Sequence, residues 1–327
     1  MMIRPTAAFA LAVCCGCVTP QEDIAQLADF KQRAARYHET GDLGRAEQQA
    51  RMGLALDPDH AILNLLLGRT LLKWHDLRSV ARSRPYLEKA YDLQPEFRTS
   101  YSLGEFHQRY AEFLIGESNL ISDRADQLES EDSAAVREMR TRADNQRSKA
   151  KEHLNDARQL LEEALGENPT SIYALRLAAN CYVHQQEDEL ALSTLAILIK
   201  ELGDSRDWKN SRLASDGSIP IPEEVYLRNL VSTELRIDLE ARGLAATIHK
   251  NAGRYANAEA LLTGILKLDP DMVREYFNRG MCRYWQGNLS GAATDMTEFI
   301  RRTSLSIDAQ EVERALDIVA ENETVKA

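Results

Sequence analysis

Residues whose side chains could perform catalysis or hold a metal ion are scattered along this sequence. A phosphate-binding loop needs glycines followed by Lys-Ser or Lys-Thr, and a common zinc motif needs His-Glu-x-x-His. Neither occurs, and no Cys-x-x-Cys pair lies beyond residue 17. The seven histidines are far apart, and we interpret His38, His107, His184 and His249 as packed or surface residues of helices. We therefore expect no enzymatic activity, no metal and no cofactor.

The composition is that of a globular helical protein with an acidic surface. Of 327 residues, 44% are hydrophobic, and only 16 are glycine and 9 proline, which favours long helices over many-turned sheets. No run of about 18 apolar residues occurs, so we expect no conventional spanning helix. The net charge of −11 argues against nucleic-acid binding, which uses a basic face.

The first 16 residues differ from the rest of the chain. Arg4 precedes a short apolar run at 6–13, and three cysteines and a glycine occupy positions 14–17. This arrangement is typical of a secretory signal and is too short to span a membrane stably. We therefore expect residues 1–16 to be removed, with an uncleaved cytosolic protein as the alternative.

The residues before the cleavage point resemble a bacterial lipoprotein signal. The resemblance implies cleavage after Gly16 and attachment of palmitate-type acyl chains to Cys17. Several acyl chains on one cysteine would anchor the protein firmly, because each buried methylene contributes about 0.8 kcal/mol. Cys14 and Cys15 remain alternative lipidation sites, as does an ordinary signal without lipidation.

A small residue recurs at places where two helices must approach closely. The distance from Ala34 to Gly68 and from Ala246 to Gly280 is 34 residues in both cases. Turn glycines and closing prolines accompany several copies. The recurring small residues are Ala34, Gly68, Gly104, Ala179, Ala246 and Gly280, and alanines follow twelve residues after four of them, at Ala46, Ala191, Ala258 and Ala292.

This pattern resembles the tetratricopeptide repeat family, which has a 34-residue period. The resemblance implies an all-α fold, a right-handed superhelical solenoid of antiparallel helix pairs. We expect about six repeats over residues 24–303, preceded by the signal at 1–16 and a tether at 17–23. Residues 304–327 should form a capping helix and a frayed tail, because the last repeat of a solenoid needs a cover.

A long helical hairpin is predicted at about 98–165. No glycine or proline occurs from 117 to 165, which predicts two helices at 98–129 and 134–165. Opposite charges on the two arms favour arms that pair with each other, and a hairpin end that docks onto a partner remains open. An apolar seam recurs every seven residues at Val136, Ala143, Ala150, Ala157 and Ala164.

A second departure from the period is the segment 203–222. Its glycines, serines and prolines predict a loop. We expect Trp208 to pack against the solenoid, with an exposed contact as the alternative. Because Ala179 and Ala246 are 67 residues apart, close to two repeats, a decayed repeat within 203–236 also remains open.

Two cysteines lie beyond the N-terminal signal. Cys181 and Cys282 both follow the small residue of their repeat by two positions. They lie two repeats apart, so we expect a separation greater than the about 7 Å that a disulfide can bridge. We expect two buried, unpaired thiols.

In the tetratricopeptide family the first helix of each repeat lines a concave groove that holds peptides or partner helices. The resemblance places one set of side chains there: Leu65, Arg69, Lys73, Tyr101, Arg109, Arg176, Asn180, His184, Phe277, Met281, Tyr284 and Trp285. Their types suit an extended acidic peptide in the middle units and an aromatic contact at the C-terminal end. Arg176 and Asn180 resemble part of a clamp for a carboxylate, but Leu244 stands where that clamp needs a further polar group, so we expect it to be incomplete.

These observations predict a non-enzymatic adaptor, lipid-anchored in the bacterial cell envelope at the outer membrane facing the periplasm, with protein or peptide partners. The hairpin is also similar to that of T-component lipoproteins of TRAP solute transporters, which implies a role in periplasmic solute uptake. An adaptor for a protease is a third possibility. The oligomeric state and the partner stay open, because the scaffold is generic.

Overall fold

The structure is a computed structural model that describes residues 20–128, 134–214, 220–306 and 309–326. The chain divides into two compact units, Met1–Pro95 and Glu96–Ala327. Within the described residues every regular element is a helix, thirteen in all, which confirms the all-α prediction. None of the helices described is long and apolar enough to cross a bilayer. The predicted signal at 1–16 and the lipidation site Cys17 lie outside the described residues.

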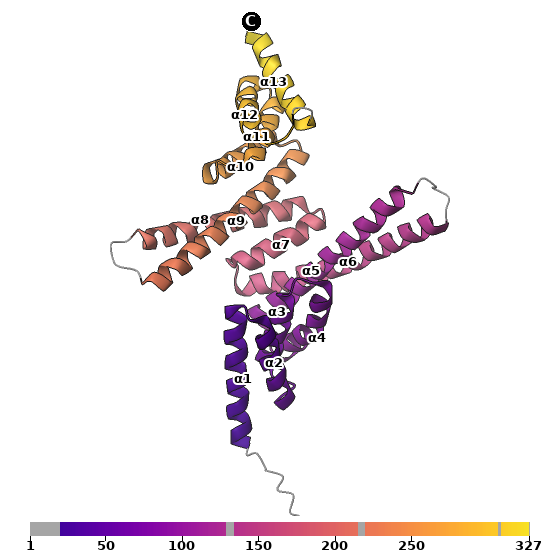
Figure 1. Cartoon of the computed structure of the whole chain (residues 1–327), viewed down its shortest axis with the longest axis vertical. Coiled ribbons are helices and arrows are strands. Elements are labelled where there is room, and N and C mark those ends of the chain that lie inside the picture. The colour runs from indigo at the N-terminus through magenta and orange to yellow at the C-terminus, as the bar shows by residue number, and fades with distance from the viewer. Residues whose placement is uncertain (1–19, 129–133, 215–219, 307–308, 327) are drawn as a thin grey trace, which may run out of the picture. The chain divides into compact units, whose positions relative to one another are not determined.

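The first unit contains two antiparallel helix pairs (Figure 1). They are α1 (Pro20–Thr40) with α2 (Leu43–Leu56), and α3 (Ala61–Leu72) with α4 (Leu77–Leu93). A Cβ added to Gly68 would lie 2.5 Å from the Leu87 side chain. The helices of the second pair therefore approach as closely as the recurring small residue predicts.

The N-terminal tether is shorter than predicted. Helix α1 begins at Pro20, so residues 20–23 of the predicted tether 17–23 are helical. Proline is favoured at the first helical position because its missing N–H would have no partner there. Asp23 follows at the positive end of the helix dipole, which stabilises the same start.

The predicted hairpin begins the second unit and matches the structure closely. Helices α5 (Phe97–Asp126) and α6 (Ala134–Glu167) lie side by side along the hairpin (Figure 1). All five residues of the seven-residue seam are buried on α6. Ion pairs Arg142–Glu117 at 2.6 Å and Arg140–Asp126 at 3.6 Å join the arms. The arms therefore pair with each other, while the hairpin end at 129–133 lies outside the described residues.

The loop predicted at 203–222 is wrong for most of its length. The next helices are α7 (Ile172–His184), α8 (Asp188–Leu213) and α9 (Ile221–Asn251), so α8 continues ten residues beyond Gly203. The added turns of α8 pack against α9, and the Lys209 Nζ atom forms an ion pair with Glu234 Oε1 at 2.7 Å. Trp208 is 64% exposed on α8, so its predicted packing against the solenoid is also wrong.

No decayed repeat occupies the described part of 203–236. That segment instead forms the far halves of α8 and α9, which extend two ordinary repeat helices. Helix α9 continues through Ala246, the small residue of the next repeat, which is buried. The 67-residue interval thus reflects longer helices rather than an extra helix pair.

The second unit ends with two helix pairs and a cap. These helices are α10 (Tyr255–Leu268), α11 (Val273–Trp285), α12 (Leu289–Arg302) and α13 (Gln310–Lys326). Val312, Ala315 and Ile318 of α13 are buried in one cluster with α12, which confirms the predicted cap. The frayed tail is wrong as far as Lys326, because α13 continues there and buries Asn322.

Candidate partner-binding groove

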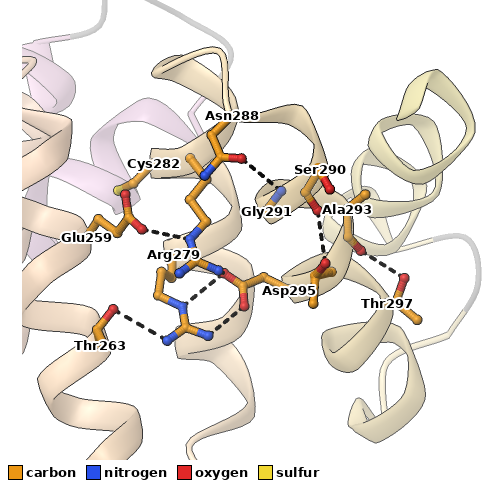
Figure 2. Close-up of polar contacts among 12 residues, drawn as sticks. Glu259, Thr263, Arg279, Cys282, Asn288, Ser290, Gly291, Ala293, Asp295 and Thr297 are labelled. Carbon is orange, nitrogen blue, oxygen red and sulfur yellow. Dashed lines mark hydrogen bonds and ion pairs between the residues drawn. The ribbon is translucent and has the colours of Figure 1, made fainter. Parts of the chain in front are cut away.

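Helix α11 carries four of the predicted groove residues, and an ionic network fixes its orientation. Arg279 donates two hydrogen bonds to Asp295 of α12, from Nε at 2.9 Å and from Nη2 at 2.6 Å. Arg283 donates to Asp295 at 2.9 Å and to Glu259 of α10 at 2.8 Å. Figure 2 shows Arg279 between Thr263 and Asp295, with Glu259 beside them. Rotation of α11 would break these bonds, so its apolar face is held away from them.

The network is buried enough to shift protonation equilibria. Asp295 is 2% exposed. The hydrogen bond to Asp295 raises the pKa of Arg279 against the opposing effect of burial. Burial alone would raise the pKa of Glu259, but hydrogen bonds from Arg283 and Gln286 outweigh it and hold that pKa below its ordinary value. Both pKa shifts favour the charged forms of Arg279 and Glu259, which are the forms that the ion pairs of the network need.

The aromatic end of the predicted groove is largely covered. Phe277, Met281 and Tyr284 pack against the cluster that α12 and α13 form. The Arg314 guanidinium of α13 lies 4.9 Å from the centre of the Tyr284 ring. Trp285 remains 44% exposed, with its ring centre 4.9 Å from that of Tyr255. Of these four residues, Trp285 offers the most open surface, because the last helix of the chain covers the others.

Arg176 and Asn180 line a small cavity between α7, α8 and α9. Leu244 also lines this cavity, at the place where a complete carboxylate clamp would need a polar group. Arg176 Nη2 lies 2.8 Å from Glu240 Oε2 of α9, and Arg236 binds the same carboxylate. A carboxylate of this chain therefore occupies the position that a ligand carboxylate would need.

Two predicted groove residues lie on α5. Tyr101 is half-buried and packs against the main core cluster of the second unit. Arg109 forms an ion pair with Glu105 at 2.7 Å, one turn earlier. Both side chains thus have structural contacts that a partner would have to share or replace.

In the first unit the predicted groove residues divide between core and surface. Leu65 is 7% exposed and belongs to the core, so it offers little to a partner. Arg69 is half-buried, and Lys73 is exposed with its Nζ donating to the His38 carbonyl oxygen at 3.1 Å. Lys73 and part of Arg69, rather than Leu65, therefore lie at the surface of the first unit.

His184 borders a cavity of about 600 Å³ at the base of the hairpin. The cavity is lined from α5 by Ile115, from α6 by Arg147, Lys151 and Leu154, and from the end of α7 by His184. Arg147, Lys151 and His184 are basic and exposed, and one acidic residue, Glu187, also lines the cavity. The sequence identified His184 as a groove residue, but Arg147 and Lys151 were assigned to charge pairing within the hairpin. Their spacing of four residues places both on one face of a helix, and this was the signal that they could line a common site.

The structure also brings together three residues that the sequence left apart. His107 of α5 and His153 of α6 have their Nδ1 atoms 2.9 Å apart, and Asp156 Oδ2 lies 3.3 Å from His107 Nδ1. Of the two predicted alternatives, a packed or a surface residue, His107 is packed, and His153 and Asp156 are its polar partners. The spacing of His153 and Asp156, one turn apart, was the signal that sequence reasoning missed.

Comparison with known proteins supports the same scaffold. Models of the tetratricopeptide repeat match residues 150–212 and 246–317. YrrB, described as a TPR protein with an unusual peptide-binding site, is similar in structure with TM-score 0.50 and 14% identity, covering 82% of this chain and 97% of YrrB. PilW, described as a widely conserved type IV pilus biogenesis factor, has TM-score 0.47 and 14% identity, covering 89% of this chain and 98% of PilW. No curated protein sequence matches significantly.

Stacked antiparallel helix pairs with small residues at their contacts define a helical repeat protein. Together with the two family matches, they show that this chain contains tetratricopeptide repeats, matched over residues 150–212 and 246–317. Domains of this family bind protein or peptide partners and are generally scaffolds rather than enzymes.

Proposed function

We propose that this protein is a non-enzymatic adaptor that holds an acidic segment of a protein partner in the cavity at the base of the α5–α6 hairpin. The observation that carries the proposal is the grouping of Arg147, Lys151 and His184 around one cavity. The protein as a whole carries net charge −11, whereas the lining of this cavity holds Arg147 and Lys151 against the single carboxylate of Glu187. Complementary charge steers a partner to its site and sets its orientation.

The size and lining of the cavity support a peptide as the ligand. A volume of about 600 Å³ falls within the range of about 300–1,000 Å³ that ligand pockets have. Ile115 and Leu154 supply apolar surface beneath the basic groups. A segment with one or two carboxylates next to an apolar side chain would satisfy both parts of the lining.

The test is recovery of a partner from envelope extracts with charge-reversed variants. The double variant Arg147→Glu/Lys151→Glu should lose a partner that the native protein recovers. The control Arg137→Glu/Lys149→Glu makes the same charge change on exposed residues of the same helix that do not line the cavity. Recovery from the control should match the native protein. Equal recovery from both double variants would refute the assignment of the cavity.

Trp285 is the second contact that we propose for the partner. Its exposed ring stands at the C-terminal end of α11 and packs beside the ring of Tyr255. Trp285→Ala should weaken recovery of the same partner. Trp74→Ala, which removes a similarly exposed ring from the other unit, is the matched control. If neither substitution changes recovery of the partner, Trp285 is not a contact and the binding site is limited to the hairpin cavity.

We further propose that the adaptor is anchored through acylated Cys17 in the outer membrane, facing the periplasm. The support is the sequence of residues 1–17, in which a short apolar run precedes Gly16 and Cys17. Radioactive palmitate should label the native protein, and Cys17→Ser should abolish the label. Cys14→Ser and Cys15→Ser are the controls. If the label persists in Cys17→Ser but disappears in Cys14→Ser or in Cys15→Ser, the cysteine replaced in that control is the lipidated residue.

The alternative of a T-component-like role in solute uptake rests on the long α5–α6 hairpin. In that role the protein would associate with a periplasmic solute-binding protein. Co-purification of such a protein that survives Arg147→Glu/Lys151→Glu would favour transport over peptide binding in the cavity. A genomic neighbourhood without any solute transporter would count against it.

A further inference from the structure

Three potential metal ligands meet where α5 packs on α6, away from the groove residues predicted from sequence. His107 lies on α5, and His153 and Asp156 lie one turn apart on α6. Within the described residues they form the group of histidine, cysteine and acidic side chains whose ligand atoms come within 4.8 Å of one another. The helical hairpin therefore presents a ligand from one arm to a pair of ligands on the other.

The distances between these atoms suit a common metal ion. His107 Nδ1 lies 2.9 Å from His153 Nδ1 and 3.3 Å from Asp156 Oδ2. Two ligand atoms that each lie about 2.0–2.2 Å from one zinc ion are about 2.9–3.5 Å apart when the angle between their bonds is about 90–110°. Both distances from His107 therefore fall in the range that coordination requires, and the ligand atoms of His153 and Asp156 lie within 4.8 Å of each other.

The surroundings hold the imidazole rings in this arrangement. The Tyr110 and Phe106 ring centres lie 4.8 and 6.1 Å from that of His153, and Phe106 lies 5.0 Å from His107. His107 is buried, His153 is half-buried and Asp156 is exposed. Ligands locked by packing bind metals better than mobile ones, because little ordering remains to be done. The exposed carboxylate leaves a side open to solvent for entry of the ion and for a water ligand.

The alternative is a hydrogen bond between two neutral histidines. Nδ1 atoms 2.9 Å apart can share only one proton, so one imidazole would donate from Nδ1 and the other would accept. A metal ion would instead take the lone pairs of both nitrogens and the charge of Asp156. Imidazole and carboxylate ligands together suit zinc and its neighbours in the first transition row.

We propose that His107, His153 and Asp156 bind a divalent transition-metal ion, zinc in the first instance, with the remaining coordination position open to water. The ion would tie α5 to α6 near the base of the hairpin. The protein would then be more stable in the presence of zinc, because only the folded hairpin assembles the three ligands.

The test is zinc titration of the full chain after removal of metals with a chelator. Asp156→Asn keeps the shape of an exposed side chain and should fold, and His153→Gln removes a half-buried ligand. Each should weaken zinc binding at least about tenfold, since even changes outside the ligand shell cost about 10–100-fold. Asp144→Asn, on the same helix, and His184→Gln are controls that should bind zinc as the native protein does. Circular dichroism checks that each variant is helical.

Two further readouts separate the proposed site from other zinc ligands. At the same zinc concentration, zinc should raise the melting temperature of the native protein and of both controls more than that of Asp156→Asn. Cobalt(II) bound at this site should show visible d–d bands without a thiolate-to-cobalt charge-transfer band. Affinity unchanged in Asp156→Asn and His153→Gln, or cobalt bound by thiolates in every variant, would overturn the proposal. Absence of zinc binding by the native protein would leave the histidine pair as a hydrogen bond.

Discussion

Lys209 of α8 and Glu234 of α9 form a buried ion pair, with Nζ 2.7 Å from Oε1. Beside it, Arg206 binds Asp238 at 2.6 Å, and the Asp238 side chain is completely buried. Both pairs join the part of α8 that the sequence predicts as a loop to α9. Buried charges without partners are costly. Pairing them across two helices therefore favours continuation of α8 over a loop that would leave them apart.

Removal of Asp238 should destabilise the protein strongly. Asp238→Ala leaves Arg206 and Arg242, which both bind Asp238, without their carboxylate. Breaking a buried pair from one side costs about 3–5 kcal/mol of unfolding free energy. Urea unfolding measures the loss. Glu224→Ala removes a more exposed partner of Arg228 on the same helix and should cost about 1 kcal/mol or less. Similar losses in the two variants would contradict the role of the buried pair.

Glycine at a repeat contact should behave differently from glycine on an open helix face. In Gly68→Ala the added Cβ meets Leu87 at 2.5 Å, and overpacking of this kind costs about 1–3 kcal/mol. In Gly116→Ala nothing lies within 4 Å of the added Cβ, so the better helix propensity of alanine should stabilise by about 0.5–1 kcal/mol. The sign of the change in denaturation midpoint distinguishes the two. Stabilisation by both would show that Leu87 moves aside freely.

His38 should make stability fall between pH 6.5 and about 4. Burial, followed by the charges of Lys73 and Arg69, lowers the pKa of His38 from 6.5 to about 4 in the folded protein. Its Nδ1 lies 3.0 Å from Thr70 Oγ1. The unfolded chain takes up the proton first as pH falls, so the contribution of His38 is complete above pH 6.5 and is lost on the way to pH 4.

The size of this effect follows from the shift, since each pKa unit corresponds to about 1.4 kcal/mol and the total is about 3 kcal/mol. The measurement is unfolding free energy against pH for the native protein and for His38→Gln, which cannot titrate. The native curve should be the steeper one in this window. Parallel curves, or a His38 pKa near 6.5 by NMR, would contradict the prediction.

The thiols of Cys181 and Cys282 should be unreactive in the folded protein. Burial, together with the charge of Glu112, raises the pKa of Cys181 to about 12, and burial raises that of Cys282. Both cysteines are unpaired and buried, as the sequence predicts. Because the thiolate is the reactive species, alkylation should modify both only after unfolding. Peptide mapping by mass spectrometry separates them from Cys14, Cys15 and Cys17. Labelling of either thiol under native conditions would show local opening.

The repeat pattern and the hairpin could be predicted because they depend on local chemistry. A small residue such as Gly68 or Gly104 reports a close helix contact wherever it recurs, since a Cβ at Gly104 would lie 2.9 Å from Leu161. The absence of glycine and proline from 117 to 165 predicts both arms within a few residues, and the seam from Val136 to Ala164 marks the buried face of the second arm. The candidate groove was less predictable, because its exposure depends on which helix is packed against each side chain.

By itself, the sequence determined the class of protein, the spacing of its helix pairs, the long hairpin and the two buried thiols, because each rests on residues close together in the chain. The tertiary structure decided the rest through contacts between distant segments. Helix α8 continues past Gly203 because α9 supplies ion-pair partners, and α13 covers the aromatic face of α11. His107 and His153, 46 residues apart, meet because the two arms pack in one particular register.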